Sequence, residues 1–230
     1  MLPPTVSVQL DEVVGELLRA RLLQHTKDSY VGVPLSKFPE DLRVYEHLLW
    51  LSAADVVIEL GVQYGGSALW FRDRLMAHAH YRGGRSARVI GVDVDIERAQ
   101  ARFAGLGQGA ATGIQLVPGD LSDPGLPARV RGLIEPGARC LVVEDSAHDY
   151  ETTSAALRGF AQFVSVGGFF VVEDGVVDVE ALRVDEDWPR GVRKATEDWL
   201  QRDGSGFVCR RDLELYGLTC HPHGFLQRQR

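Results

Sequence analysis

Acidic pairs follow two apolar runs in the second half of the chain. Glu144-Asp145 follows one run and Glu173-Asp174 follows the other. Short apolar runs of this kind predict buried strands of a parallel sheet, and the carboxyl ends of such strands lie at one edge. The acids would therefore share a small volume and raise one another's pKa. A hard cation such as Mg²⁺, which takes oxygen ligands, would relieve this repulsion.

We therefore predict that Asp145, Glu173 and Asp174 bind Mg²⁺. Arginine partners or helix N-termini that neutralise the acids are the alternative, and whether Glu144 joins the site is left open. His148 stands three residues after Asp145 in an expected turn, which would bring its imidazole back over the metal. A neutral imidazole there can take a proton from a hydroxyl that the metal polarises. His148 and Asp145 are thus the predicted catalytic residues.

The stretch Asp55–Phe71, DVVIELGVQYGGSALWF, predicts a strand, a glycine turn and a helix in that order. This order places backbone N–H groups and a helix N-terminus at the sheet edge where nucleotide-like ligands bind. The spacing differs from the dinucleotide pattern G-x-G-x-x-G, and the acid before the turn would repel a pyrophosphate but attract the ammonium or sulfonium of S-adenosylmethionine (SAM). The predicted SAM-binding residues, with Ser67 as the helix N-cap, are Glu59, Gly61, Gly65, Gly66 and Ser67. The alternative is that the glycines only form a tight turn.

Two further polar sites follow later strands. Asp93 stands where a carboxylate can grip a ribose diol, although it could instead cap the helix expected over Ile96–Phe103. Asp120 and Ser122 lie in a G-D-x-S turn, where Asp120 could accept from an adenine amino group. The same pattern is also common turn chemistry. We predict that Asp93, Asp120 and Ser122 contact the cofactor.

A sheet must bring these residues together, and the chain contains the strands for one. They are expected at Val56–Ile58, Val89–Val92, Ile114–Val117, Cys140–Val143 and Phe169–Val172. Helical patterns separate them, which predicts an α/β fold: a Rossmann-like, doubly wound, mostly parallel sheet. The final segment, 206–230, alternates like two antiparallel strands that close the sheet.

The predicted organisation has two parts. Residues 1–54 are expected to form an N-terminal helical extension, which either packs on the sheet, covers the cleft or pairs subunits. In its second helix, which should start near Pro39, one apolar stripe is expected: Leu42, Tyr45, Leu48, Leu49 and Leu51. Residues 55–230 form the catalytic domain. Within it, 175–191 is acidic and of low periodicity, which makes it a candidate lid loop.

Composition excludes several classes of protein. The formal net charge of -7 argues against binding to nucleic acid or to an anionic membrane. Neither a signal peptide nor a long apolar run is present, so we expect a cytoplasmic protein. The three cysteines lack metal or redox spacing and are expected to be reduced and structural. Arg far outnumbers Lys, which we interpret as compositional bias, and a metal site at His221 or His223 is disfavoured.

Seven segments in order carry a resemblance to a known family. They are VPLSKFPEDLRVYEHLL, VIELGVQYGGSALWF, VIGVDVD, GDLSD, VVEDSAHDYE, GGFFVVED and LYGLTCHPHGFLQR. In combination they resemble the cephalosporin-hydroxylase/rhamnosyl O-methyltransferase family of class I SAM-dependent methyltransferases, and more loosely the macrolide-sugar O-methyltransferases. The resemblance implies SAM and Mg²⁺ as cofactors, the metal held by Asp145, Glu173 and Asp174, His148 as the base, and a homo-oligomer.

These observations predict a Mg²⁺-dependent SAM O-methyltransferase. Its acceptor would be a small molecule, a sugar or another oxygen of a secondary metabolite such as an antibiotic. The family name also allows a hydroxylase or a methoxylation partner protein, although the 2-His-1-carboxylate set of nonhaem iron is not evident. A noncatalytic SAM-binding subunit would be expected to lack catalytic acids, and here they are present. The glycine spacing disfavours a nicotinamide oxidoreductase.

Overall fold

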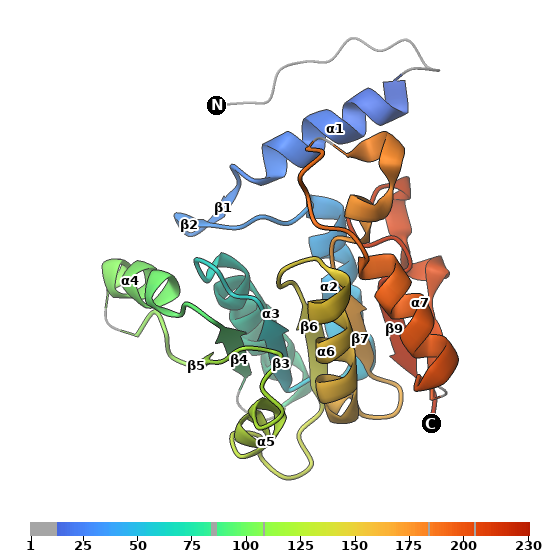
Figure 1. Cartoon of the computed structure of the whole chain (residues 1–230). Helices are drawn as coiled ribbons and strands as arrows, with labels where there is room; N and C mark the ends of the chain where they lie inside the picture. Colours follow the sequence, from blue (N-terminus) through green and yellow to red (C-terminus); the bar gives the residue numbers. More distant parts are fainter. Residues whose placement is uncertain (1–12, 84–86, 108, 184, 205) are drawn as a thin grey trace.

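The computed structural model describes residues 13–83, 87–107, 109–183, 185–204 and 206–230. At its centre these residues form a seven-stranded sheet in the order β5-β4-β3-β6-β7-β9-β8 (Figure 1). The strands are β3 (Val56–Leu60), β4 (Arg88–Asp93), β5 (Ile114–Pro118), β6 (Cys140–Glu144), β7 (Phe169–Val172), β8 (Phe207–Cys209) and β9 (Phe225–Arg228). Strands β3 to β7 pair in parallel, whereas β8 and β9 are antiparallel. The predicted doubly wound, mostly parallel sheet with antiparallel closing strands is confirmed.

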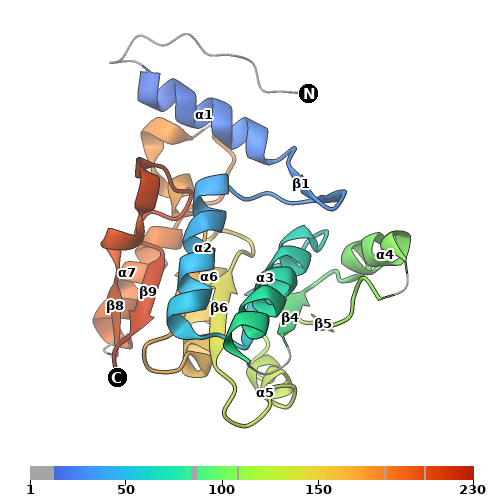
Figure 2. The ribbon, with the colours of Figure 1, turned by 180° about the vertical axis from the view of Figure 1, so that it is seen from behind.

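Helices cover both faces of this sheet. On one face lie α2 (Pro39–Ser52), α3 (Gly66–Arg82) and α4 (Glu97–Leu106), with α2 and α3 in front of the strands in Figure 2. On the other face lie α5 (Leu126–Arg131), α6 (Tyr150–Phe160, followed by a 3₁₀ turn over Ala161–Phe163) and α7 (Val192–Arg202). None of the helices among the described residues has the length and apolar character to cross a membrane.

The central strands are buried on both faces, as their apolar sequences predict. Val57 packs with the α2–α3 side of the core, whereas the adjacent Ile58 packs with the α5–α6–α7 side. This alternation follows from the pleat, which points successive side chains to opposite faces. Every residue of β3 is buried, so functional side chains are expected at the strand ends and in the loops that follow them.

The N-terminal region is part of this core. Helix α1 (Val13–His25) and the hairpin β1 (Ser29–Tyr30) and β2 (Val33–Pro34) precede α2 (Figure 1). Tyr45, Leu48 and Leu49 of α2 are at most 1% exposed. Leu51 is 62% exposed, so its place in the predicted stripe is wrong. Helical geometry puts positions 45, 48, 49 and 52 on one face, and Ser52 is buried where Leu51 was expected.

The candidate lid, 175–191, contains two 3₁₀ turns, Gly175–Asp178 and Glu180–Leu182, and little other regular structure. The Asp178 carboxylate links the two ends of this loop, because it accepts hydrogen bonds from the N–H groups of Gly191 and Arg193, each at 2.7 Å. Arg183 donates to carbonyl oxygens within the loop. The loop is therefore internally cross-linked, and its movement over a ligand stays a prediction.

Candidate active site

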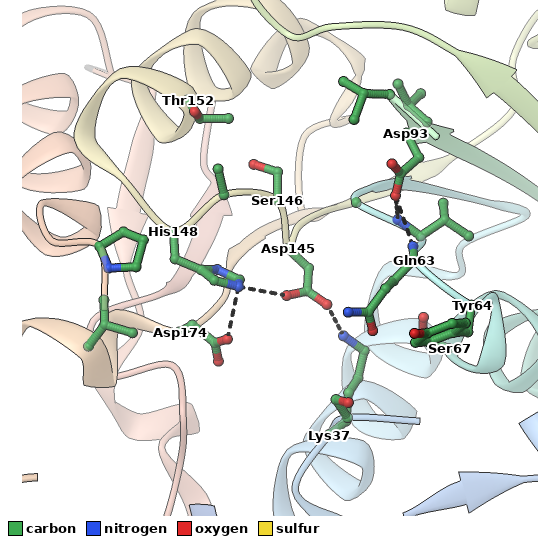
Figure 3. Close-up of a pocket in the computed structure, with 18 of the residues that line it drawn as sticks. Lys37, Gln63, Tyr64, Ser67, Asp93, Asp145, Ser146, His148, Thr152 and Asp174 are labelled. Carbon is green, nitrogen blue, oxygen red and sulfur yellow. Dashed lines mark hydrogen bonds and ion pairs between the residues drawn. The ribbon is translucent and has the colours of Figure 1, made fainter. Parts of the chain in front are cut away.

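A cleft of ≈ 750 Å³ lies along the carboxyl edge of the parallel strands. Figure 3 shows part of its wall. The loops after β3, β4, β5, β6 and β7 line it, together with residues of α1, of the segment before α2 and of the 175–191 loop. Among the lining residues from the strand loops are Gly61, Gln63, Tyr64, Ser67, Asp93, Gly119, Asp120, Asp145, Ser146, His148 and Asp174. The volume suits a ligand of nucleotide size together with a small acceptor.

The glycine turn after β3 is shaped by close packing. Gly61 has φ +93°, and a Cβ at this position would lie 1.9 Å from the Asp145 carbonyl oxygen, so no other residue fits between the tips of β3 and β6. Gly65, rather than Ser67, is the N-cap of α3; the N-cap prediction for Ser67 is wrong. Gly61 and Ser67 line the cleft, but Gly65 and Gly66 do not. A close approach of protein atoms therefore explains Gly61 without a ligand.

The Asp93 carboxylate stabilises the glycine turn after β3 by hydrogen bonds and does not cap α4. Its Oδ2 accepts from the N–H groups of Val62 and Gln63, both at 2.8 Å, and its Oδ1 accepts from the N–H of Asp95 at 2.9 Å. Ile96 is the N-cap of α4. A carboxylate has about four acceptor positions, so a bidentate grip on a ribose diol would require Asp93 to release one backbone N–H. Asp93 does line the cleft.

Glu59 lies inside the protein. Its side chain does not line the cleft, and neither carboxylate oxygen has a hydrogen-bond partner among the described residues. Burial raises the pKa of Glu59 to about 8, although Lys37 and Ser67 act in the opposite direction. Removal from water disfavours the charged form of an acid, and here it outweighs these two neighbours. Contact between Glu59 and the ammonium of SAM thus stays a prediction.

The G-D-x-S turn divides between two surfaces. Asp120 lines the cleft, whereas Ser122 lines a separate surface hollow. The Asp120 carboxylate accepts from the Ser122 N–H at 2.8 Å, which is the local turn bond that this sequence favours. The geometry brings Asp120 to the cleft with Asp93, but it does not bring Ser122 there.

The strand-tip acids meet a lysine that the sequence analysis did not assign to the site. Lys37 Nζ lies 2.9 Å from Asp145 Oδ2 and 2.7 Å from each Glu173 carboxylate oxygen (Figure 3 shows the bond to Asp145). Burial by itself lowers the pKa of Lys37, but the charges of Asp145 and Glu173 outweigh it, and the pKa stays well above its usual value. Lys37 is therefore a buried, charged partner of both strand tips.

His148 faces the other oxygens of this cluster. Its Nε2 lies 3.4 Å from Asp174 Oδ2 and 4.0 Å from Asp145 Oδ1, as Figure 3 shows. Asp145, His148 and Asp174 each offer one ligand atom, and these atoms lie within 4.8 Å of one another. His148 and Asp174 have φ +57° and +55°, a conformation that non-glycine residues rarely adopt and that clusters at functional sites.

Glu144 has a different environment. Its buried carboxylate accepts from the hydroxyl and N–H of Ser146 and does not line the cleft. Burial raises the pKa of Glu144 to about 7. Of the Glu144-Asp145 pair, only Asp145 therefore presents an oxygen to the cleft.

A profile of the rhamnosyl O-methyltransferase/CmcI family matches residues 23–229. The chain belongs to this family.

Relatives of the rhamnosyl O-methyltransferase/CmcI family agree with the match. The rhamnosyl O-methyltransferase of Mycobacterium tuberculosis is 26% identical over 206 residues, covering 88% of this chain and 79% of that protein. A CmcI structure with Mg and SAM superposes with a TM-score of 0.64 at 22% identity, covering 88% of this chain and 77% of that one. The Bacillus cereus O-methyltransferase in complex with SAH gives 0.54 at 13% identity, covering 88% and 84%. These structures confirm the fold, and membership confirms the predicted enzyme class, an O-methyltransferase.

The acids at the tips of β6 and β7 also contact residues that sequence reasoning missed. His221 Nδ1 accepts the Asp174 N–H at 3.1 Å, and its Nε2 lies 3.6 Å from Asp41 Oδ2. The Tyr45 hydroxyl donates to Glu173. Lys37, Asp41 and Tyr45 come from the segment before the predicted catalytic domain. The sequence did contain one indication that Lys37 is unusual, because it is one of only three lysines in an arginine-rich chain.

Proposed function

We propose that this O-methyltransferase transfers the methyl group of SAM to a hydroxyl of a small-molecule acceptor, with Mg²⁺ bound at the acids that end β6 and β7. The observation that carries the proposal is the pair Asp145 and Asp174, which faces a cleft of ≈ 750 Å³ with one carboxylate oxygen of each within 4.8 Å of the other, and with His148 beside them as the base. Two carboxylate oxygens fit Mg²⁺, which commonly takes one or two protein carboxylates and completes its shell with water and substrate oxygens.

The donor would occupy the half of the cleft built by the loops after β3, β4 and β5. Gly61–Tyr64, Asp93 and Asp120 line this half. Related proteins support the choice of donor, since a CmcI structure contains Mg and SAM and the B. cereus enzyme is in complex with SAH. The acceptor would then lie between this half and the wall formed by α1 and the 175–191 loop.

His148 would remove the acceptor proton. Its Nε2 faces the cleft, and Asp174 at 3.4 Å stabilises the imidazolium that forms. The hydroxyl oxygen attacks the methyl carbon as the carbon–sulfur bond breaks, which yields a methyl ether, S-adenosylhomocysteine (SAH) and a proton on His148. Bound Mg²⁺ would supply Lewis-acid chemistry that makes the hydroxyl more acidic. The walls of the cleft hold donor and acceptor in line, which provides much of the acceleration.

Before donor and metal bind, the charged side chains among the described lining residues are mostly acidic. Four carboxylates line the cleft: Asp93, Asp120, Asp145 and Asp174. Lys37 is the one Lys or Arg among the described lining residues, and it is already paired. The acceptor wall contains Leu22, Val176, Val177 and Trp188, which suit an apolar or ring-shaped surface. A glycoside with an apolar ring face fits this wall, so we expect turnover of glycosides in a mass-spectrometric screen.

Two measurements test the proposal. Calorimetry should show SAH binding to the full chain, and methyl transfer to a screened glycoside should stop in EDTA and return when Mg²⁺ is added in excess. SAH binding with chelator-resistant transfer would remove the metal from the mechanism. Oxygen-dependent turnover without conversion of SAM to SAH would instead favour the hydroxylase alternative.

A further inference from the structure

One tryptophan lines the cleft from the 175–191 loop. Trp188 is partly buried, and it packs against the hydrophobic core on the α5–α6–α7 side of the sheet. Its indole N–H makes no hydrogen bond with any of the described residues. The indole is a donor only, and a tryptophan with one end in an apolar surface commonly pairs this N–H. Trp188 is therefore a cleft residue with an apolar ring and an unused donor.

Hydrogen bonds within the loop fix the backbone of Trp188. Arg183 donates to the carbonyl oxygens of Trp188 at 2.6 Å and Pro189 at 3.4 Å. The Trp188 N–H donates to the carbonyl oxygen of Asp185 at 3.4 Å. A side chain whose backbone is held before a ligand arrives loses less conformational entropy on binding. The ring is thus suited to serve as a binding surface.

The ends of the 175–191 loop lie beside the predicted catalytic residues. The loop starts directly after Asp174, and at its other end Gly191 forms a β-bridge with Asp149, the residue after His148. Gly191 packs so closely on the start of α6 that a Cβ would lie 2.7 Å from an atom of that helix. Trp188 is three residues from Gly191, a span of at most about 11 Å. Trp188 therefore lies on the side of the cleft where His148 stands (Figure 3 shows His148).

The loop and α1 contribute further apolar side chains to the cleft. Val176 and Val177 line it and are 3% and 5% exposed, and Leu22 of α1 lines it and is 2% exposed. Ligand sites of this kind combine an apolar surface with a few polar groups that fix orientation. A pyranose ring has a face of C–H groups and a rim of hydroxyls, so it matches an indole that offers an apolar ring and one donor. An open-chain alcohol has no such face.

We propose that Trp188 is a specificity-determining residue that packs its indole on one face of a ring-shaped acceptor, a glycoside, and thereby turns an acceptor hydroxyl toward His148. This inference rests on the proposed O-methyl transfer and assigns a residue to the choice of acceptor. Cyclic glycosides are then preferred over open-chain alcohols, and the preference resides in the ring of Trp188.

Acceptor titrations at saturating SAM, with a panel of methyl pyranosides, test this role. Trp188→Ala should raise the acceptor KM by about 10–100-fold, whereas Trp188→Phe, which keeps an aromatic face, should raise it by less than about fivefold. We expect kcat and the SAH dissociation constant to change little in either variant. Trp50→Ala is the matched control, because Trp50 is 47% exposed near the end of α2 and does not line the cleft. An unchanged KM in Trp188→Ala, or equal KM increases in Trp188→Ala and Trp188→Phe, would overturn the inference.

A binding measurement separates this inference from the proposed function. Trp188 is one of four tryptophans. Adding the methyl pyranosides to the SAH-bound protein should change the tryptophan emission of wild type and of Trp50→Phe, but not that of Trp188→Phe. The matched open-chain alditols should leave the emission unchanged. An emission change that persists in Trp188→Phe, or none with any pyranoside, would overturn the inference and leave methyl transfer intact. Failure of wild type to bind SAH would overturn the proposed function and the role of Trp188 with it.

Discussion

At the scale of single residues, the proton-transfer step depends on His148. Replacing it with Gln should lower kcat by about 10²–10⁴-fold, because a positioned general base contributes that much, and should leave the SAH dissociation constant unchanged. The measurements are steady-state methyl transfer and SAH calorimetry. His80→Gln, at an exposed position near the end of α3, is the matched control. Wild-type turnover in His148→Gln would exclude His148 as the base.

Glu59 makes a separate prediction about stability and pH. Its pKa is about 8 in the folded protein, against an ordinary value of 4.5, because of burial. Between these values the folded protein keeps a proton that the unfolded chain has lost, so this group destabilises the fold as pH rises from about 4.5 to 8. Glu59→Gln cannot ionise. Its free energy of unfolding, relative to wild type, should therefore increase over that pH range in urea titrations at several pH values. A pH-independent difference would show that the Glu59 carboxyl has no raised pKa.

The individual acids and the histidine of the site could be predicted from sequence because each follows a recognisable strand. Asp145, His148 and Asp174 are neighbours at one edge for that reason. Lys37 could not be placed, because 108 residues separate it from Asp145 and 136 from Glu173. Its role is decided by tertiary packing, which periodicity does not report. The number of acceptor bonds on Asp93 is likewise a property of the folded turn.

At the scale of elements, the 175–191 loop is held in shape by Arg183. Its guanidinium donates to the carbonyl oxygens of Val177 at 2.6 Å, Glu186 at 2.9 Å and Trp188 at 2.6 Å. Charge-assisted hydrogen bonds of this kind contribute about 1.5–3 kcal/mol each when buried, and these are partly exposed. Losing them should loosen the wall of the cleft that contains Trp188.

We therefore expect Arg183→Ala to raise the KM for the acceptor by about tenfold, a change of about 1.4 kcal/mol, with little effect on SAH affinity. Arg190→Ala is the control within the same loop, because Arg190 is exposed and forms its ion pair with the exposed Glu180. The comparison is made by acceptor titration at saturating SAM. If both variants keep the wild-type KM, the loop does not shape the acceptor site.

Secondary-structure elements could be predicted from sequence where a single local pattern, such as a short apolar run, was clear. Strands β3, β4, β6 and β7 were found because each is a short apolar run that the fold largely buries. Strand β5, at the edge of the sheet, is mostly not buried and was found from its apolar residues alone. Sequence patterns gave wrong predictions where tertiary packing decides which of two neighbouring residues caps a helix or faces the core. Gly65, with φ +86°, starts α3 two residues before the better capping residue Ser67, since the turn needs a left-handed residue there. Leu51 was misplaced because apolar character alone does not define a helix face.

At the scale of the whole molecule, the hydrophobic core contains residues from both sides of the predicted boundary between residues 54 and 55. The face of α2 toward the sheet includes Val44, Tyr45, Leu48 and Leu49, each at most 1% exposed. Tyr45 packs edge-to-face on Phe71 of α3, with ring centroids 5.0 Å apart. The same region supplies Lys37 to the strand tips. Core and active site are thus both shared between the two predicted parts.

A chain that begins at residue 55 should therefore fail to fold. Burying each large apolar side chain contributes about 1.5–3 kcal/mol, so losing four removes about 6–12 kcal/mol, comparable with the total stability of a typical domain. Removal of Lys37 adds the cost of leaving Asp145 and Glu173 beside each other without a cation. Near-UV circular dichroism and thermal unfolding of 55–230 should show no fixed tertiary packing and no cooperative transition. Cooperative unfolding together with SAH binding by 55–230 would instead establish residues 1–54 as a separable extension.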